Sequence, residues 1–157
     1  MTAPLPKQMP LGLRGARKTD VRTQFAAVCY RIKASRVEIL LITSRRTRRW
    51  IVPKGWPVRG KSPSESALHE AWEEAGVVGR VNPRPIGIYS YVKLLGQDAG
   101  LPCVAMVYAV KVKELARDYP ERAERRRKWV SRKKAGAMVD EPELARILRE
   151  FDPKALR

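Results

Sequence analysis

Residues 53–77 read PKGWPVRGKSPSESALHEAWEEAGV, and this stretch decides the fold. Within it, Glu70, Glu73 and Glu74 have the spacing i, i+3 and i+4, which places three carboxylates on one face of a helix. The chain has only 16 acidic residues against 33 basic ones, so this local concentration of acids needs a reason. Clustered carboxylates repel one another, and a hard divalent cation such as Mg²⁺ relieves that repulsion because it prefers oxygen ligands. The spacing therefore fits a cation-binding helix, and an amphipathic helix whose acidic face is only solvated fits it equally well.

The ends of this helix are predicted by its flanking residues. Ser62 is expected to be the N-cap, Pro63 the first helical residue, and Glu65 the partner of Ser62 in an S-x-x-E capping box. Gly76 is expected to end the helix, because glycine readily adopts the left-handed conformation found at many helix ends. At about 100° per residue, the apolar side chains occupy one arc. That arc consists of Ala67, Leu68, Ala71, Trp72 and Ala75.

The same stretch resembles the Nudix box, whose pattern is G-x5-E-x7-R-E-U-x-E-E-x-G-U, where U is a bulky aliphatic residue. Two positions depart from it, since Lys61 stands where the first Glu belongs and His69 where the Arg belongs. Ala71 is a small substitute for the first U. The residues that match the box are Gly55, Glu70, Glu73, Glu74, Gly76 and Val77.

This resemblance implies a fold, a cofactor and a reaction. The implied fold class is α/β, a Nudix-type α/β/α sandwich with a mixed β-sheet. The implied cofactor is Mg²⁺ or Mn²⁺, held by Glu70, Glu73 and Glu74 together with the carbonyl of Gly55. The implied reaction is hydrolysis of a diphosphate linked to another moiety, in which bound metal neutralises phosphate oxygens and lowers the pKa of a water.

The departures and the general base leave alternatives open. Lys61 either contacts a substrate phosphate or is a solvated loop lysine. His69 is expected to orient a metal-ligating carboxylate, as the box arginine does, and a purely structural histidine is the alternative. A general base must lie within reach of the attacking water, and the candidates are Glu74 and Glu121. Glu121 is equally well explained as a solvated partner of the neighbouring arginines.

A net charge of +17 points to polyanionic partners. The basic residues concentrate on either side of the box, which favours contacts with substrate phosphates over an evenly basic surface. Arginine is suited to this task because its planar fork binds phosphate through two hydrogen bonds. The residues predicted to bind substrate are Arg45, Arg46, Arg48, Arg49, Lys54, Lys61, Arg125, Arg127 and Lys128.

Three further stretches indicate the substrate. FAAVCYR (25–31), ILLITSRRTRRWIVPKG (39–55) and ERRRKWVSRKKA (124–135) resemble the diphosphoinositol polyphosphate phosphohydrolases, although Lys54-Gly55-Trp56-Pro57 replaces their glycine-rich turn. A phosphate-rich small molecule, diphosphoinositol polyphosphate, is therefore the first expectation. Nucleoside or dinucleoside polyphosphates or RNA 5′ ends are the second, and a non-catalytic Nudix-fold module that binds a polyanion is the third. The aromatic residues available for base stacking are Trp50, Trp56, Tyr89, Tyr91 and Trp129.

One domain is expected over residues 21–152, preceded by a flexible basic tail (1–20) and followed by a short tail (153–157). No apolar run reaches the ~18 residues that a membrane span needs, and the first 20 residues lack the apolar segment of a secretory signal. A cytoplasmic location is expected, with an organelle transit peptide as an open alternative. Cys29 and Cys103 are expected to be buried, reduced thiols. Strands are predicted over 23–32, 37–43, 50–52, 86–95, 101–112 and 128–130, and further helices over 132–139 and 142–151.

Overall fold

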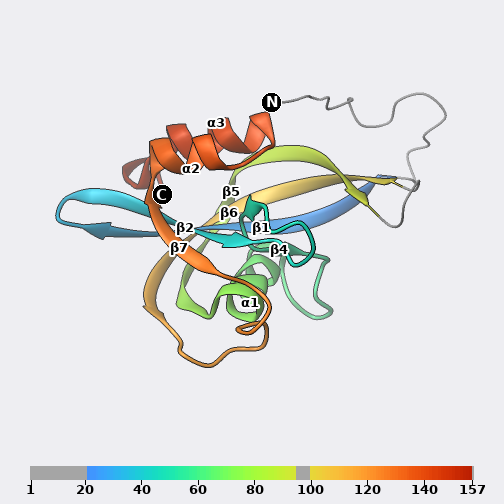
Figure 1. The fold of residues 1–157 in the computed structure, drawn as a ribbon, viewed down its shortest axis with the longest axis horizontal. Coiled ribbons are helices and arrows are strands. Elements are labelled where there is room, and N and C mark those ends of the chain that lie inside the picture. Colours follow the sequence, from blue (N-terminus) through green and yellow to red (C-terminus); the bar gives the residue numbers. More distant parts are fainter. Residues whose placement is uncertain (1–20, 95–99, 157) are drawn as a thin grey trace.

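The protein folds as a mixed sheet between two helical layers (Figure 1). The computed structural model describes residues 21–94 and 100–156. Helix α1 (Pro63–Ala75) covers one face of the sheet, and α2 (Arg132–Met138) and α3 (Pro142–Glu150) cover the other. The predicted α/β/α sandwich is therefore confirmed. The predicted N-terminal tail (1–20) lies outside the described residues.

The described residues form a seven-stranded sheet whose main path is β3-β2-β1-β6-β5, with β4 paired to β1 and β7 to β2. The central pair, β1 and β6, is parallel, and the other pairs are antiparallel. A short 3-10 helix, η2 (Pro153–Ala155), follows α3. The strands are β1 (Arg22–Lys33), β2 (Arg36–Thr43), β3 (Trp50–Ile51), β4 (Lys54–Gly55), β5 (Val77–Leu94), β6 (Gly100–Leu115) and β7 (Arg127–Ser131).

Strand β5 begins about nine residues earlier than its predicted start at 86. Its first half contains Pro83 and Pro85, which the sequence pattern marks as breakers of a strand. The prolines are tolerated because β5 is an edge strand, where a missing N–H costs no ladder hydrogen bond. Register shifts between Val81 and Pro85 and between Pro85 and Gly87 absorb the irregularity as bulges.

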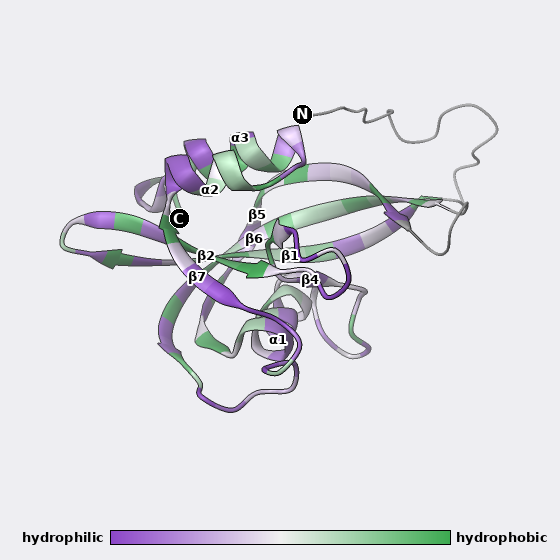
Figure 2. Ribbon diagram, viewed as in Figure 1, coloured by the Kyte–Doolittle hydropathy of each residue, from purple (hydrophilic) through white to green (hydrophobic). Residues whose placement is uncertain are grey.

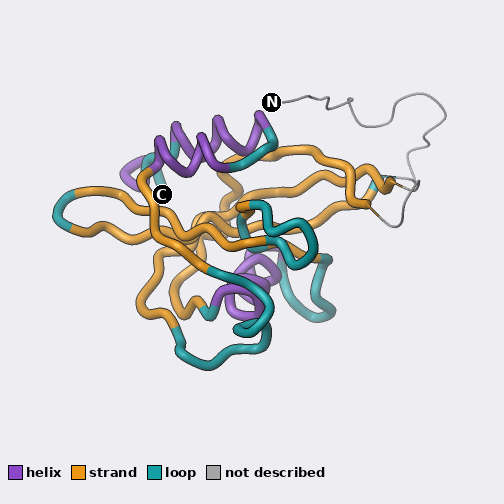
Figure 3. The backbone as a smooth tube through the Cα atoms, viewed as in Figure 1, coloured by secondary structure: helices purple, strands orange, loops and turns teal. Residues whose placement is uncertain are grey.

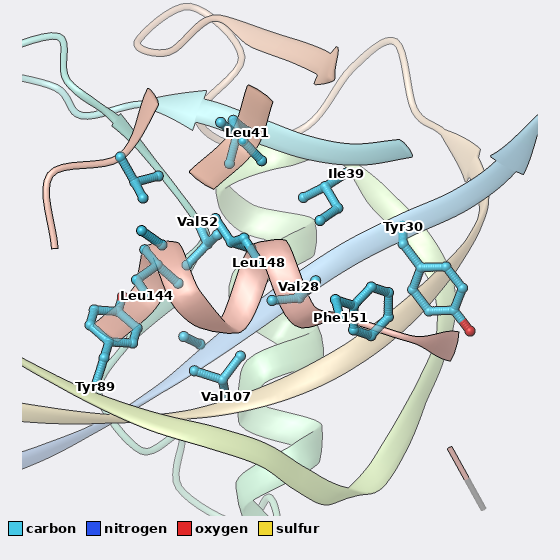
Figure 4. Close-up of a cluster of buried hydrophobic side chains, with 14 of the residues drawn as sticks. Val28, Tyr30, Ile39, Leu41, Val52, Tyr89, Val107, Leu144, Leu148 and Phe151 are labelled. Carbon is cyan, nitrogen blue, oxygen red and sulfur yellow. The ribbon is translucent and has the colours of Figure 1, made fainter. Parts of the chain in front are cut away.

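Both faces of the sheet are buried, which explains the long apolar run in β1. Side chains alternate along a strand, so a strand covered on both faces has apolar residues at successive positions. Leu144 and Leu148 of α3 pack against the sheet near Val28 and Val107 (Figure 4). Figure 2 shows hydrophobic residues in the strands between the layers and hydrophilic residues on α2 and on the chain leading into β7. The β1 residues facing α2 and α3 are Ala26, Val28 and Tyr30, and those facing α1 are Phe25, Ala27 and Cys29.

Helix α1 begins and ends where its flanking residues predict. The Ser62 side chain accepts a hydrogen bond from the Glu65 N–H, and the Glu65 carboxylate accepts one from the Ser62 N–H, at 3.2 Å and 2.8 Å. Gly76 ends the helix with φ 67°, in the left-handed region that favours glycine. These caps fix the rotation and length of α1, and hence the direction in which its carboxylates point.

Candidate active site

Gly55 lies directly against the carboxylate of Glu70. A Cβ atom added at Gly55 would lie 2.4 Å from Cδ and 2.6 Å from Oε1 of Glu70. Gly55 is held there because β4 pairs with β1, with Gly55 opposite Phe25. The contact brings together two of the predicted metal-binding residues, and only glycine leaves room for it.

Glu74 is a buried carboxylate at the centre of the site, with 7% of the residue exposed. Its Oε1 accepts a hydrogen bond from the Lys54 backbone N–H at 3.3 Å. Burial raises the pKa of Glu74 to about 7, although the charges of Arg125 and Lys54 oppose the shift. Burial also raises the pKa of Glu70, and repulsion from Glu73 adds to the effect. The acidic face of α1 is thus a crowded, partly desolvated group of carboxylates rather than a solvated one.

The segment between β6 and β7 passes around α1 and brings Glu121 to the same site (Figure 3). The Glu121 N–H donates to the Glu73 carbonyl oxygen at 3.0 Å, and the Ala116 N–H donates to the Gly76 carbonyl oxygen at 2.8 Å. The Glu121 charge raises the pKa values of both Glu70 and Glu74, so its carboxylate lies near theirs. The two candidates for the general base are therefore neighbours, although they lie far apart in sequence.

Arg125 links these carboxylates, and only 7% of its side chain is exposed. Its Nε donates to Glu121 Oε1 at 2.8 Å, and its Nη2 lies 3.5 Å from Glu74 Oε2. Its Nη1 donates to the Thr43 carbonyl oxygen at 3.1 Å. No sequence signal identified this network, because the four residues come from three separate segments of the chain.

Arg127, like Arg125, donates its hydrogen bonds to other groups of the protein. Its guanidinium donates to the Ala75 carbonyl oxygen at 2.7 Å and to the Ala116 carbonyl oxygen at 3.0 Å, and it lies 4.8 Å from the centre of the Tyr119 ring. These contacts satisfy a carbonyl at the end of α1 and hold the following segment in place. The prediction that Arg127 binds substrate stays untested, but most of its donors already have partners.

Five of the other predicted basic residues fall into two groups. Arg45 lies at the carboxylates, since its guanidinium pairs with Glu124 at 3.3 Å and its pKa is raised by that hydrogen bond and by Glu121. The remaining four make no side-chain hydrogen bond or ion pair with any described residue and are exposed, so they are available to an anion. These are Arg46, Arg48, Lys61 and Lys128.

His69 lies half-buried on α1, next to Glu70 in sequence. Within residues 21–94 and 100–156 its ring makes no hydrogen bond or ion pair. Its predicted role in orienting a carboxylate stays a prediction, and in this arrangement Arg125 contacts the carboxylates instead.

A second polar group lies on the α3 side of the sheet. Lys54 is opposite Ala26 of β1, which faces α2 and α3, and its Nζ lies 5.0 Å from the centre of the Tyr91 ring. Burial lowers the pKa of Lys54, and the charges of Glu74 and Glu141 oppose this. Arg49, predicted to bind substrate, pairs with Glu141 at 3.2 Å and also with Asp140. The other carboxylate oxygen of Glu141 is buried without a hydrogen-bond partner among the described residues.

The donor set of α1 fits a hard divalent cation. Glu70, Glu73 and Glu74 offer carboxylate oxygens, which Mg²⁺ and Mn²⁺ prefer, and Gly55 adds a nearby backbone carbonyl. In the part of the chain that the structure describes, no three acidic, histidine or cysteine side chains converge on one point. Binding an ion would therefore require the carboxylates to turn about their side-chain bonds, which long glutamate side chains can do.

Comparison with known proteins agrees with this architecture. The NUDIX domain family matches residues 22–152. Nudix hydrolase 12, mitochondrial, from Arabidopsis thaliana is 32% identical over 120 residues, covering 74% of this chain and 59% of that protein. Diphosphoinositol polyphosphate phosphohydrolase 3-beta from Homo sapiens is 31% identical over 106 residues, covering 66% of this chain and 60% of that protein. The chain thus spans about three-fifths of the length of these relatives.

Solved structures agree on the fold. The binary complex of a C. elegans Ap4A hydrolase superimposes with a TM-score of 0.62 over 83% of this chain and 94% of that one. The sequence identity is 20%, so this likeness supports the architecture alone. Among the described residues, no helix is long and apolar enough to cross a membrane.

Proposed function

Because the chain belongs to the NUDIX domain family, we propose that it is a metal-dependent hydrolase that cleaves a diphosphate bond in a phosphate-rich small molecule. The observation that carries this proposal is the packing of Gly55 against Glu70, beside the buried Glu74 and with Glu121 brought in from a distant segment. In a purely structural helix, burying one carboxylate beside two others would be unfavourable, because unneutralised carboxylates repel one another.

Glu70, Glu73, Glu74 and the Gly55 carbonyl would hold Mg²⁺ or Mn²⁺. When bound, the ion would neutralise the diphosphate oxygens and acidify the attacking water. Glu121 or Glu74 would then accept the proton of that water, since both lie at the site and phosphoryl transfer depends chiefly on positioning and electrostatics. The raised pKa of Glu74 is compatible with a role as proton acceptor.

Diphosphoinositol polyphosphate is the proposed substrate. Its many phosphates require several cations around them. Arg45 is one such cation beside the carboxylates, and the loop after β2 adds the exposed Arg46 and Arg48. The sequence similarity to a human diphosphoinositol polyphosphate phosphohydrolase points the same way.

Nucleoside or dinucleoside polyphosphates are the second candidate substrates, and one observation supports them. Trp56 follows Gly55 directly and is 40% exposed, with Lys93 Nζ 6.0 Å from its ring centre. An exposed aromatic ring next to a cation can stack a base beside a phosphate. A non-catalytic module that binds RNA is less consistent with the site, because its acidic face would repel a phosphate backbone.

A substrate screen tests the proposal. The protein is incubated with Mg²⁺ and, separately, a diphosphoinositol polyphosphate, a dinucleoside tetraphosphate, a capped RNA oligonucleotide and ADP-ribose, and released product is measured. Glu73→Gln and Glu74→Gln are expected to lower turnover by on the order of 10²-fold or more without unfolding the protein. Glu114→Gln, an exposed carboxylate on β6, is the matched control and should have no effect. Unchanged turnover in both α1 variants would refute a catalytic metal site.

A further inference from the structure

We propose that Arg125 is a positioning residue that fixes Glu74 and Glu121 relative to each other, rather than a residue that binds substrate phosphate. This inference rests on the proposed metal-dependent hydrolysis and adds a role at that same site. It rests on three contacts, each made by a different guanidinium nitrogen of the nearly buried Arg125 side chain.

The geometry of these contacts makes Arg125 a link between three segments. Nε contacts Glu121 in the segment after β6, Nη2 contacts Glu74 on α1, and Nη1 contacts the Thr43 carbonyl at the end of β2. The next residue strengthens the anchorage, because the Arg126 N–H donates to Thr43 Oγ1 at 2.9 Å. A planar guanidinium presents donors in several fixed directions, so it holds its partners at set positions.

Burial argues against a direct role in binding substrate. Only 7% of the Arg125 side chain is exposed, whereas 59% of the Arg45 side chain is exposed at the same site. A substrate phosphate would have to displace Glu121 or Glu74 from Arg125, which would leave a partly buried carboxylate without its partner. Breaking a buried pair in this way is unfavourable, and Arg45 is available without that cost.

The residue at the box position that usually holds an arginine also supports a positioning role for Arg125. His69 occupies that position and makes no hydrogen bond or ion pair with a carboxylate among the described residues. The guanidinium that contacts a box carboxylate in this protein comes instead from Arg125, over 50 residues later in the chain. Arg125 would thus limit the directions in which Glu74 and Glu121 turn when an ion binds, so that the two carboxylates stay beside each other.

The decisive variant is Arg125→Lys, because it keeps the positive charge and removes the fork. Binding of Mn²⁺ is measured by the loss of the free-ion signal in electron paramagnetic resonance, which needs no substrate or turnover. Groups that orient metal ligands typically contribute about 10–100-fold to metal affinity, so a weakening of that size is expected. Hydrolysis of a diphosphoinositol polyphosphate and of a dinucleoside tetraphosphate should show a lower kcat with KM changed by less than about twofold, as expected when only positioning is lost.

Arg122→Ala is the matched control. Arg122 lies in the same segment and pairs with Asp118 at the same four-residue spacing, but its side chain is 58% exposed. It is expected to change neither Mn²⁺ affinity nor kcat. If Arg125→Lys lowers the folded fraction seen by circular dichroism, a second variant is used, Arg125→Met, which keeps the size of the unbranched part of the side chain and removes the guanidinium. The same separate changes in kcat and KM are then measured for it.

The outcomes separate the two proposals. Wild-type affinity and turnover in Arg125→Lys would overturn the positioning role, and so would a rise in KM alone in either variant. If wild-type protein binds no Mn²⁺ and hydrolyses none of the four substrates, the proposed function is refuted and this role with it. Weakened Mn²⁺ binding together with a lower kcat at unchanged KM supports both.

Discussion

Replacing Gly55 with alanine should abolish most activity while leaving the protein stable. The added Cβ would lie 2.4 Å from Cδ, 2.6 Å from Oε1 and 2.8 Å from Cγ of Glu70. All three atoms belong to a flexible side chain, so the clash is relieved when Glu70 rotates and no backbone has to move. Gly55 does not have the positive φ found at Gly60 and Gly76, so alanine introduces no backbone strain.

The size of the effect follows from the displacement. To reach the ordinary contact distance of 3.4 Å, the Glu70 carboxyl carbon must move by about 1 Å. A misplacement of about 1 Å in a catalytic arrangement costs roughly 10²-fold in rate. The rotation of one side chain costs only about 0.5–1.5 kcal/mol if it becomes strained, and less if another rotamer is open.

Gly79→Ala is the matched control, because it should lower stability and leave activity intact, the reverse of what is expected for Gly55→Ala. There the added Cβ would lie 2.2 Å from the Lys111 carbonyl oxygen, which is backbone within the β5–β6 ladder. The backbone cannot rotate away, so we expect a loss of stability of about 1–3 kcal/mol with the site intact. Thermal unfolding and Mg²⁺-dependent turnover are measured for both variants. Full activity in Gly55→Ala would show that the Gly55–Glu70 contact is not part of the site.

Three further predictions concern groups around the site. Arg127→Ala should lower the free energy of unfolding in urea by about 1.5–3 kcal/mol, because two backbone carbonyls lose a charged donor, and a change in KM without a change in stability would contradict this. Arg45→Ala should raise KM by roughly twofold to tenfold at low salt and less at high salt, as expected for a largely exposed charge that binds phosphate. An unchanged KM at low salt would contradict a role for Arg45 in binding phosphate. Cys29 should remain unreactive toward a thiol reagent in native protein as the pH rises past the usual thiol range, since burial raises its pKa and keeps it protonated, whereas reaction without unfolding would show that the β1 core opens.

The parts of the molecule that the sequence predicted well are those decided by local chemistry. The limits of α1 follow from Ser62, Glu65 and Gly76, whose interactions reach no more than a few residues. The start of β5 and the whole of β4 were missed, because both depend on a partner strand. Pro83 and Pro85 look incompatible with a strand until β5 is known to be at an edge, and Lys54 and Gly55 form a strand only because β1 lies beside them.

The same distinction holds for the site. The acidic face of α1 is visible in the sequence as a helical spacing, and the resemblance makes Glu121 a candidate base. The contacts of Arg125 were not predictable, since they join residues 43, 74 and 121 through the path of the chain around α1. Its position within a basic run suggested a phosphate ligand, and nothing in the run marks which arginine turns inward.

The basic residues therefore divide into two classes that the composition does not separate. Arg125 and Arg127 use their donors on the protein's own carboxylates and carbonyls, and Arg49 pairs with Glu141. Among the described residues, Arg45 forms its ion pair with Glu124, an exposed carboxylate that a phosphate can replace at little cost. All of these charges contribute to the long-range field, so salt should slow the association of any polyanion. We therefore expect the specific contacts that set KM to come from the exposed class, so the net charge alone overstates how many arginines a substrate can meet.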